Sequence, residues 1–330
     1  MPLSPASEAL LSVCLLALLP ALGHASEVDN FVEWRSRHKL KDARPVIDFE
    51  SARAWDEALR DVSLEGCDER KLYKSLMKQF GNHVKTTMGK WLYATDQLDG
   101  HKIEREDSIY NDLRLKESIV LNASFSNFLD KLNVDIGLGK LVRYGDHYIG
   151  IDKFEHFWST GASYFKEKSF KKRGSLEEAL AYGEKMENGI LGARTTGVYS
   201  YGDLSANFNG MRFWNHVLQK EDDVLGRDFN LGPYVACKSG KWETVKRPIW
   251  GNYIDASWSE ANNCSKFRSQ SMLDKVQAAL SAEGHTRGAK PLTCPTEASS
   301  MKALIKKYSP KDRPWLHRHL LNTRFGVVGK

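Results

Sequence analysis

A glutamate on the apolar face of a predicted helix is the residue of this chain best suited to chemistry. Ser175 is followed three residues later by Glu178, the spacing of a capping box, which predicts a helix over 174–191. Glu187 falls on the apolar stripe of this helix. Because burial disfavours a charged carboxylate, we expect a raised pKa for Glu187, which suits a general acid near neutral pH. The alternative is a glutamate that reaches solvent at a frayed helix end.

The residues after Glu187 predict a small cleft. Glycines end the helix, and Tyr199 and Tyr201 favour a short extended or hairpin segment. Asp203 can cap a second helix, and Asn207 lies on the apolar side of that helix, where a buried amide must be hydrogen-bonded. Two helices that each turn a polar residue inward, joined by a short aromatic loop, can hold a substrate. The alternative is that Asn207 is a structural anchor.

A third predicted helix carries further polar residues. Asp152 and Glu155 have the spacing of a capping box, or one of them serves as a second carboxylate that activates water or stabilises an oxocarbenium ion. Asp152 and His156, one helical turn apart, could also bind a metal ion. A third ligand would then come from Asp203 or His216. Because the HExxH pattern is missing, we expect no metal and assign His156 to orienting a carboxylate.

The order of these residues resembles the lysozyme and lytic transglycosylase superfamily. In that superfamily a catalytic glutamate at the end of a buried helix is followed by a glycine-containing hairpin and another helix. Here Glu187 corresponds to the acid and Gly197–Asn207 to the hairpin, without a counterpart of the family's hairpin glutamine. The resemblance covers about 175–214. It implies a lysozyme-like helical core, cleavage of peptidoglycan, and sugar contacts from the hairpin.

A second resemblance is to VanZ-like envelope proteins, which share the pattern DKxxH…E…DxxxN. The match spans about 149–214 and implies an envelope protein without a settled chemistry. In this alternative the polar residues bind an envelope fragment or only join helices. The matching residues are Asp152, Lys153, His156, Glu187, Asp203 and Asn207.

The charge of the predicted cleft favours a particular substrate. Four acids would gather there in a protein with a net charge of +6, namely Asp152, Glu155, Glu187 and Asp203. An acidic pocket attracts a cationic sugar, so we expect a preference for deacetylated peptidoglycan. In this respect the chain resembles the deacetylation-specific lysozymes of predatory bacteria.

The first residues of the chain predict export. A short apolar run over 9–22 is followed by small residues at 23 and 25, so we interpret 1–25 as a signal peptide of a secreted or periplasmic protein. No later run approaches the length of a membrane span. Four cysteines then remain, an even number that predicts two disulfides in three open connectivities. They are Cys67, Cys237, Cys264 and Cys294.

The remaining sequence predicts a single mainly α domain (α+β) over 26–330. Its lysozyme-like core would cover about 149–265, with a small β-hairpin at the cleft and helical elaborations on both sides. Helices are expected at 31–40, 67–93, 113–132, 272–282 and 301–308, a loop at 137–150, irregular or strand-like structure at 229–258, and the best linker at 284–295.

Basic clusters at 35–44, 166–173 and 302–324 favour attraction to polyanions. For an exported protein we expect the partner to be peptidoglycan, with no nucleic acid bound. No GxSxG elbow, P-loop or dinucleotide fingerprint is present, so we expect no cofactor. We also expect a monomer.

Overall fold

The computed structural model describes residues 27–31, 39–63, 66–102, 108–119, 121–122, 138–169, 174–189, 192–286 and 292–329. The predicted signal peptide, 1–25, lies outside the described residues. So do most of the helix predicted at 31–40, part of that predicted at 113–132, and part of the predicted linker at 284–295.

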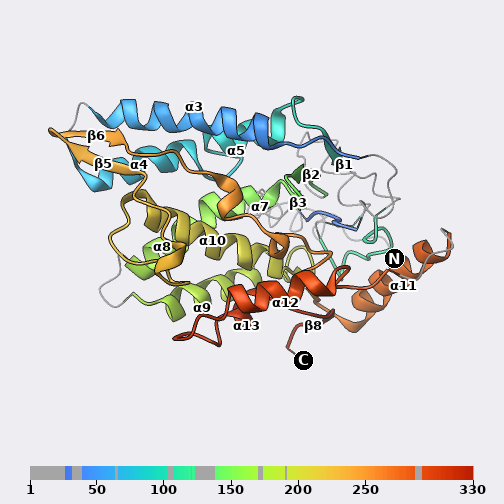
Figure 1. Ribbon diagram of the computed structural model, residues 1–330. Helices are drawn as coiled ribbons and strands as arrows, with labels where there is room; N and C mark the ends of the chain where they lie inside the picture. Colours follow the sequence, from blue (N-terminus) through green and yellow to red (C-terminus); the bar gives the residue numbers. More distant parts are fainter. Residues whose placement is uncertain are drawn as a thin grey trace, which may run out of the picture.

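The centre of the molecule is built from helices, as predicted for a mainly α protein. One nearly continuous rod consists of α7 (Asp152–Glu155), the π-helical turn η2 (His156–Thr160) and α8 (Gly161–Ser169). It packs along α10 (Tyr201–Leu218), and α9 (Leu176–Glu187) lies against α8. Ser175 caps α9 as predicted, since its hydroxyl accepts the N–H of Glu178 at 3.2 Å. Figure 1 shows these helices in the middle of the molecule.

Two glycines let the rod and α10 approach each other closely. A Cβ atom on Gly210 would lie 1.9 Å from the carbonyl oxygen of Phe157, and one on Gly161 would lie 2.6 Å from the Cα of Gly210. A larger residue at either position would push the two backbones apart. This contact holds His156 of the rod opposite Asn207 of α10.

We therefore expect Gly210→Ala to destabilise the protein by about 1–3 kcal/mol or more, because the added methyl group has no room. Urea unfolding measures the change. Gly251→Ala is the control, since a Cβ atom there would meet only a Tyr144 ring carbon at 3.8 Å. Equal stabilities of the two variants would contradict the close approach.

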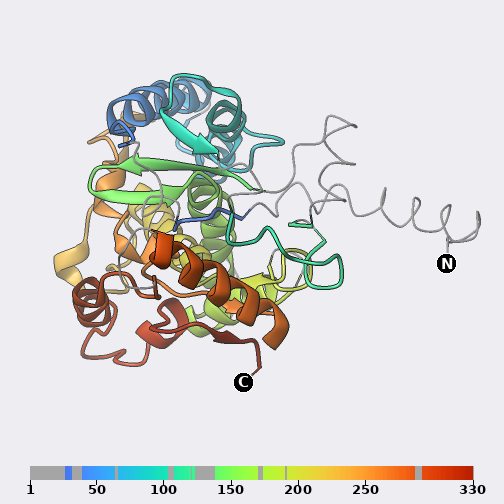
Figure 2. The ribbon, with the colours of Figure 1, turned by 90° about the vertical axis from the view of Figure 1, so that its right-hand side faces the viewer.

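Among its described residues, the N-terminal part adds three helices and a small sheet. The helices are α3 (Arg44–Ser63), α4 (Glu69–Gln79) and α5 (Thr87–Ala94). The antiparallel sheet has the order β1 (Gly100–Lys102), β2 (Lys140–Tyr144) and β3 (His147–Gly150). Figure 2 shows β2 and β3, in green, below the blue helices.

Two predictions for this part need correction. The helix predicted over 67–93 is two helices, because α4 ends at Gln79, with Phe80 as its C-cap, and Thr86 caps α5 through the N–H of Gly89. The loop predicted at 137–150 is wrong over its described residues, 138–150, most of which form the hairpin of β2 and β3. The glycine signal belongs to its turn, where Gly145 has a φ of +64°.

The helix predicted at 113–132 is also wrong over its described residues, 113–119 and 121–122, which form turns. Local bonds hold these turns. The Glu117 carboxylate accepts the N–H of Arg114 at 2.8 Å, and the N–H of Ile119 donates to the carbonyl of Thr195 at 2.9 Å. The second bond ties the segment to the loop after α9.

The C-terminal part confirms several predictions. The irregular region contains the hairpin β5 (Val235–Lys238) and β6 (Lys241–Thr244) and the 3-10 turns η3 (Arg227–Phe229), η4 (Trp250–Asn252) and η5 (Ala256–Trp258). The helices α11 (Gln270–Thr286) and α12 (Ala298–Lys307) agree with the predicted ones, and α13 (His317–Leu320) follows.

The β-hairpin predicted beside Glu187 does not form. Instead β4 (Val198–Tyr199) pairs with β7 (Lys266–Phe267), and β7 pairs with β8 (Gly326–Val327). The reason is local: Ser200 caps α10 directly after β4, so the chain turns into a helix before a second strand can return. Asp203, predicted as this cap, lies inside the helix and gives its N–H to Ser200 at 3.1 Å.

The two predicted disulfides are present, and the structure settles their pairing. Cys67 bonds to Cys237 and joins the start of α4 to β5, whereas Cys264 bonds to Cys294. Within the part of the chain that the structure describes, every helix is too short or too polar to cross a bilayer. Two disulfides are compatible with the predicted export.

Candidate functional site

A buried group of polar side chains lies where the rod, α9, α10 and the segment after η5 meet. Each of its members is at most 6% exposed. We name it the charge cluster. Its members are Glu27, Asp152, Lys153, His156, Glu187, Ser200, Asp203, Asn207 and Glu260. Charged side chains buried this deeply are costly unless they are paired or hydrogen-bonded.

Lys153 is the centre of the charge cluster. Its Nζ lies 2.6 Å from a carboxylate oxygen of each of Asp152, Asp203 and Glu260, and its side chain is 0% exposed. Burial alone would lower the pKa of Lys153, but the three carboxylates outweigh burial and raise the pKa well above its usual value. The lysine is therefore a permanent cation inside the protein.

His156 links two residues of α10. Its Nε2 lies 3.1 Å from the Oδ2 of Asp203, and its Nδ1 lies 3.1 Å from the Oδ1 of Asn207. Burial opposes protonation, yet the charge of Asp203 raises the pKa of His156 to about 9. Protonated His156 therefore donates to both residues. Burial would likewise raise the pKa of Asp203, but His156 and Lys153 hold it well below its usual value.

Glu187 faces inward at the last residue of α9, as the sequence predicts. Its side chain is 1% exposed, and its Oε1 accepts the backbone N–H of Ser200 at 2.7 Å. Burial and then the charge of Asp203 raise the pKa of Glu187 to about 8. The carboxyl group is therefore protonated at neutral pH. The alternative, in which the Glu187 side chain reaches solvent at a frayed helix end, is wrong.

The rod contains an irregular turn at the charge cluster. The π-helical turn η2 begins at His156, and such turns are frequent at functional sites. The capping-box interpretation of Asp152 and Glu155 is wrong, because α7 begins without a side-chain cap. Asp152 points to Lys153 instead, and its Oδ1 has no hydrogen-bond partner among the described residues.

Glu155 lies apart from this arrangement. Its Oε2 is 2.7 Å from the Nδ1 of His83, which follows α4. The carboxylate therefore points toward the connection between α4 and α5. The structure does not place it beside Glu187, where a second catalytic carboxylate was expected.

Tyr199 and Tyr201 line a surface pocket of about 440 Å³. Their rings meet edge to face, with centroids 5.3 Å apart. Asn188, the residue after Glu187, also lines the pocket, and Ser200 lies between the two tyrosines in sequence. The pocket thus adjoins the backbone that holds the Glu187 carboxyl. Its other polar lining residues are Glu184, Lys185 and Lys266.

The candidate metal ligands are already bonded to cationic side chains of the protein. Ligand atoms of Asp152, His156 and Asp203 lie within 4.8 Å of one another. The ammonium group of Lys153 already bridges the two aspartates, and a protonated His156 has no lone pair for a metal ion. His216, the other ligand considered, bonds to Tyr253 at 2.7 Å and lies 2.9 Å from Asp223.

Sequence reasoning missed three members of the charge cluster. They are Ser200, Glu260 and Glu27. Ser200 donates its hydroxyl to Glu260 at 2.8 Å. Burial first, and then the charges of neighbouring acids, raise the pKa of Glu27 well above its usual value. Ser200 precedes a helix and could have been recognised as its cap. Glu27 and Glu260 lie in segments without a periodic pattern, so the sequence held no signal for them.

The charge cluster makes stability depend on pH. The raised pKa of His156 gives stability that is complete below 6.5 and lost as the pH rises to about 9. Glu187 acts in the same direction, between its ordinary pKa of 4.5 and about 8. We therefore expect the melting temperature to fall from about pH 6.5 to 8, where both groups contribute. A melting temperature that rises over this range in buffers of constant ionic strength would contradict the assignment.

The comparisons with known proteins give no match. No family model matches the chain, and neither the curated proteins nor the solved structures searched yield a similar one. The function must therefore be argued from the site.

Proposed function

We propose that the protein is an exported glycoside hydrolase that cleaves the glycan strands of peptidoglycan, with Glu187 as general acid. The observation that carries the proposal is a buried carboxyl group at a helix end whose pKa is raised to about 8. Such a group keeps its proton at neutral pH and can give it to a glycosidic oxygen as the bond breaks.

The pocket beside Glu187 supports a sugar as substrate. Tyr199 and Tyr201 offer aromatic faces, and Asn188 and Lys266 offer hydrogen bonds to hydroxyl or acyl groups. Glu187 itself is covered, so the proposal includes a movement that uncovers its carboxyl when a glycan strand binds. Exclusion of water from the closed site preserves the proton on Glu187.

Asp203 is the carboxylate best suited to the second role. It stays ionised, since His156 and Lys153 both lie against it and hold its pKa low. A fixed negative charge can stabilise an oxocarbenium ion without being consumed. In this proposal His156 and Asn207 position Asp203, and Glu155 has no part in the chemistry.

The proposal includes a preference for deacetylated peptidoglycan, although the acids that support it differ from those predicted. Glu155 is paired with His83 and no longer contributes. Even with Glu187 protonated, the charge cluster holds more acids than cations, since Glu27, Asp152, Asp203 and Glu260 face Lys153 and His156. This excess of acids favours a positively charged amino sugar over its neutral acetylated form.

The test is digestion of purified peptidoglycan sacculi, native and enzymatically deacetylated, by the wild type and Glu187→Gln. Mass spectrometry identifies the released fragments. Release by the wild type alone supports the proposal, with reducing ends for hydrolysis and 1,6-anhydro ends for transglycosylation. No release from either wall would overturn it, and equal release from both walls would overturn the charge preference.

One observation favours a second function, a non-catalytic envelope module. The three carboxylates around Lys153 leave this cation fully satisfied, as in a network that joins helices. In that case the sacculi bind the protein without being cleaved, and Glu187→Gln changes the melting temperature only. Binding measured by co-sedimentation with sacculi separates this function from the enzymatic one.

A further inference from the structure

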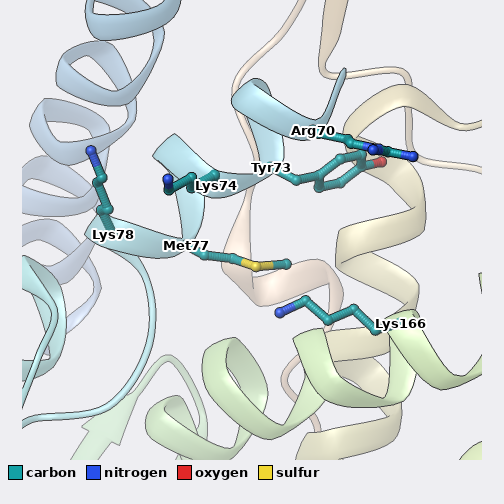
Figure 3. Close-up of a pocket in the computed structure, with 6 residues that line it drawn as sticks. All are labelled: Arg70, Tyr73, Lys74, Met77, Lys78 and Lys166. Carbon is teal, nitrogen blue, oxygen red and sulfur yellow. The ribbon is translucent and has the colours of Figure 1, made fainter. Parts of the chain in front are cut away.

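A second pocket, of about 600 Å³, lies between α4 and α8, and four cationic side chains surround it. Figure 3 shows its lining residues, with Lys166 extending from α8 below Met77. Five come from α4 and one from α8. They are Arg70, Tyr73, Lys74, Met77, Lys78 and Lys166.

The cationic side chains of this basic pocket lie close to like charges. Arg70, Lys74 and Lys78 recur every four residues on α4, and like charges at this spacing destabilise a helix. None of the four cationic side chains has an ion pair within the part of the chain that the structure describes. The adjacent acid Glu69 bonds instead to Lys220 at 2.6 Å. The repulsion persists unless an anion from outside relieves it.

The floor of the basic pocket is apolar. The ring of Tyr73 is buried, with its centroid 5.2 Å from that of Phe165 and 6.3 Å from that of Trp214. Met77 lies half-buried beside it, and its flexible thioether adapts to an apolar guest. A simple anion would use the cationic rim and leave this floor exposed to water.

We propose that the basic pocket binds an anionic membrane lipid, with the phosphate group on the lysines and the adjoining apolar chain against Tyr73 and Met77. Exposed lysine and arginine side chains are attracted to anionic lipid surfaces, and ammonium and guanidinium groups bind phosphate oxygens. The apolar floor distinguishes a lipid from a purely hydrophilic polyanion. This proposal is independent of the glycosidase, because none of its residues belongs to the charge cluster.

The test begins with sedimentation of the protein with vesicles of phosphatidylcholine, with and without phosphatidylglycerol. The pocket variant is Lys74→Gln/Lys78→Gln. The matched control is Lys302→Gln/Lys306→Gln, which removes two exposed lysines at the same spacing from α12. Loss of two basic residues from a lipid-binding surface should weaken binding to phosphatidylglycerol vesicles about 30-fold, while the control binds like the wild type. No binding to these vesicles, or an equal loss in both variants, would overturn the proposal.

A second measurement tests the apolar floor and separates a lipid from free phosphate. Titration calorimetry compares dodecyl phosphate, as a monomer, with inorganic phosphate. We expect the wild type to prefer dodecyl phosphate, and Met77→Gln, which keeps the side-chain length, to lose that preference. Equal affinity of the wild type for both ligands would overturn the lipid assignment. Melting curves of all variants establish that they are folded.

Discussion

Replacement of Lys153 by methionine is expected to destabilise the protein by about 3–5 kcal/mol. The variant keeps roughly the volume of the side chain but removes the ammonium group that contacts Asp152, Asp203 and Glu260 together. Carboxylates left without their cation in a dry interior must repel one another or take up protons. Equilibrium unfolding in urea measures the loss.

The control for this variant is Lys307→Met. Lys307 lies 2.6 Å from one carboxylate, that of Asp255, and its side chain is 24% exposed. We expect a smaller loss there, because one partly solvated pair is broken. The loss in Lys153→Met should also shrink as the pH falls toward about 6, because without Lys153 the pKa of Asp152 lies above its value of about 6 in the wild type, and the protonated acid no longer repels its neighbours. If the loss of stability is equal in both variants and independent of pH, Lys153 does not stabilise the three buried carboxylates as proposed.

The second large effect concerns turnover. Glu187→Gln is expected to lower the rate of glycan release by about 10²–10⁴-fold, because the amide cannot donate a proton to the leaving oxygen. The fold should persist, since the side-chain oxygen of glutamine can still accept the N–H of Ser200. Fragment release over time, with melting curves of both proteins, measures the two outcomes separately.

The control is Glu177→Gln, an exposed glutamate in the first turn of the same helix, which should retain full activity. Wild-type activity should also decline as the pH rises beyond about 8, where Glu187 loses its proton. Undiminished release by Glu187→Gln would remove this residue from the mechanism. Activity that increases above this pH would mean that another group is the acid.

Local patterns were enough to predict the helix that carries Glu187. Ser175 and the apolar stripe depend only on neighbours a few residues away, and such signals survive in any tertiary context. The burial of Asn207 followed from the same reasoning on α10. Both predictions are confirmed, because the helix face that the sequence period predicts to be buried is the face that the fold buries.

The contacts between residues far apart in the chain could not be predicted from the sequence. Glu155 fits a capping box and yet bonds to His83, since the fold brings the connection between α4 and α5 to that face of the rod. The extended residues at Val198–Tyr199 pair with β7, which lies far along the chain. Tertiary contacts of this kind decide between local alternatives that have similar energies.

The charge cluster should also delay the compaction of the chain during folding. Lys153 and Glu260 are 107 residues apart, and burying the lysine is costly until that carboxylate arrives. We expect the rod and α10 to remain hydrated and separable until the segment after η5 has docked, so the last steps of folding depend on distant contacts, which form slowly. Under the proposed export, this delay would help an unfolded chain to cross the membrane, because Lys153 disfavours early collapse.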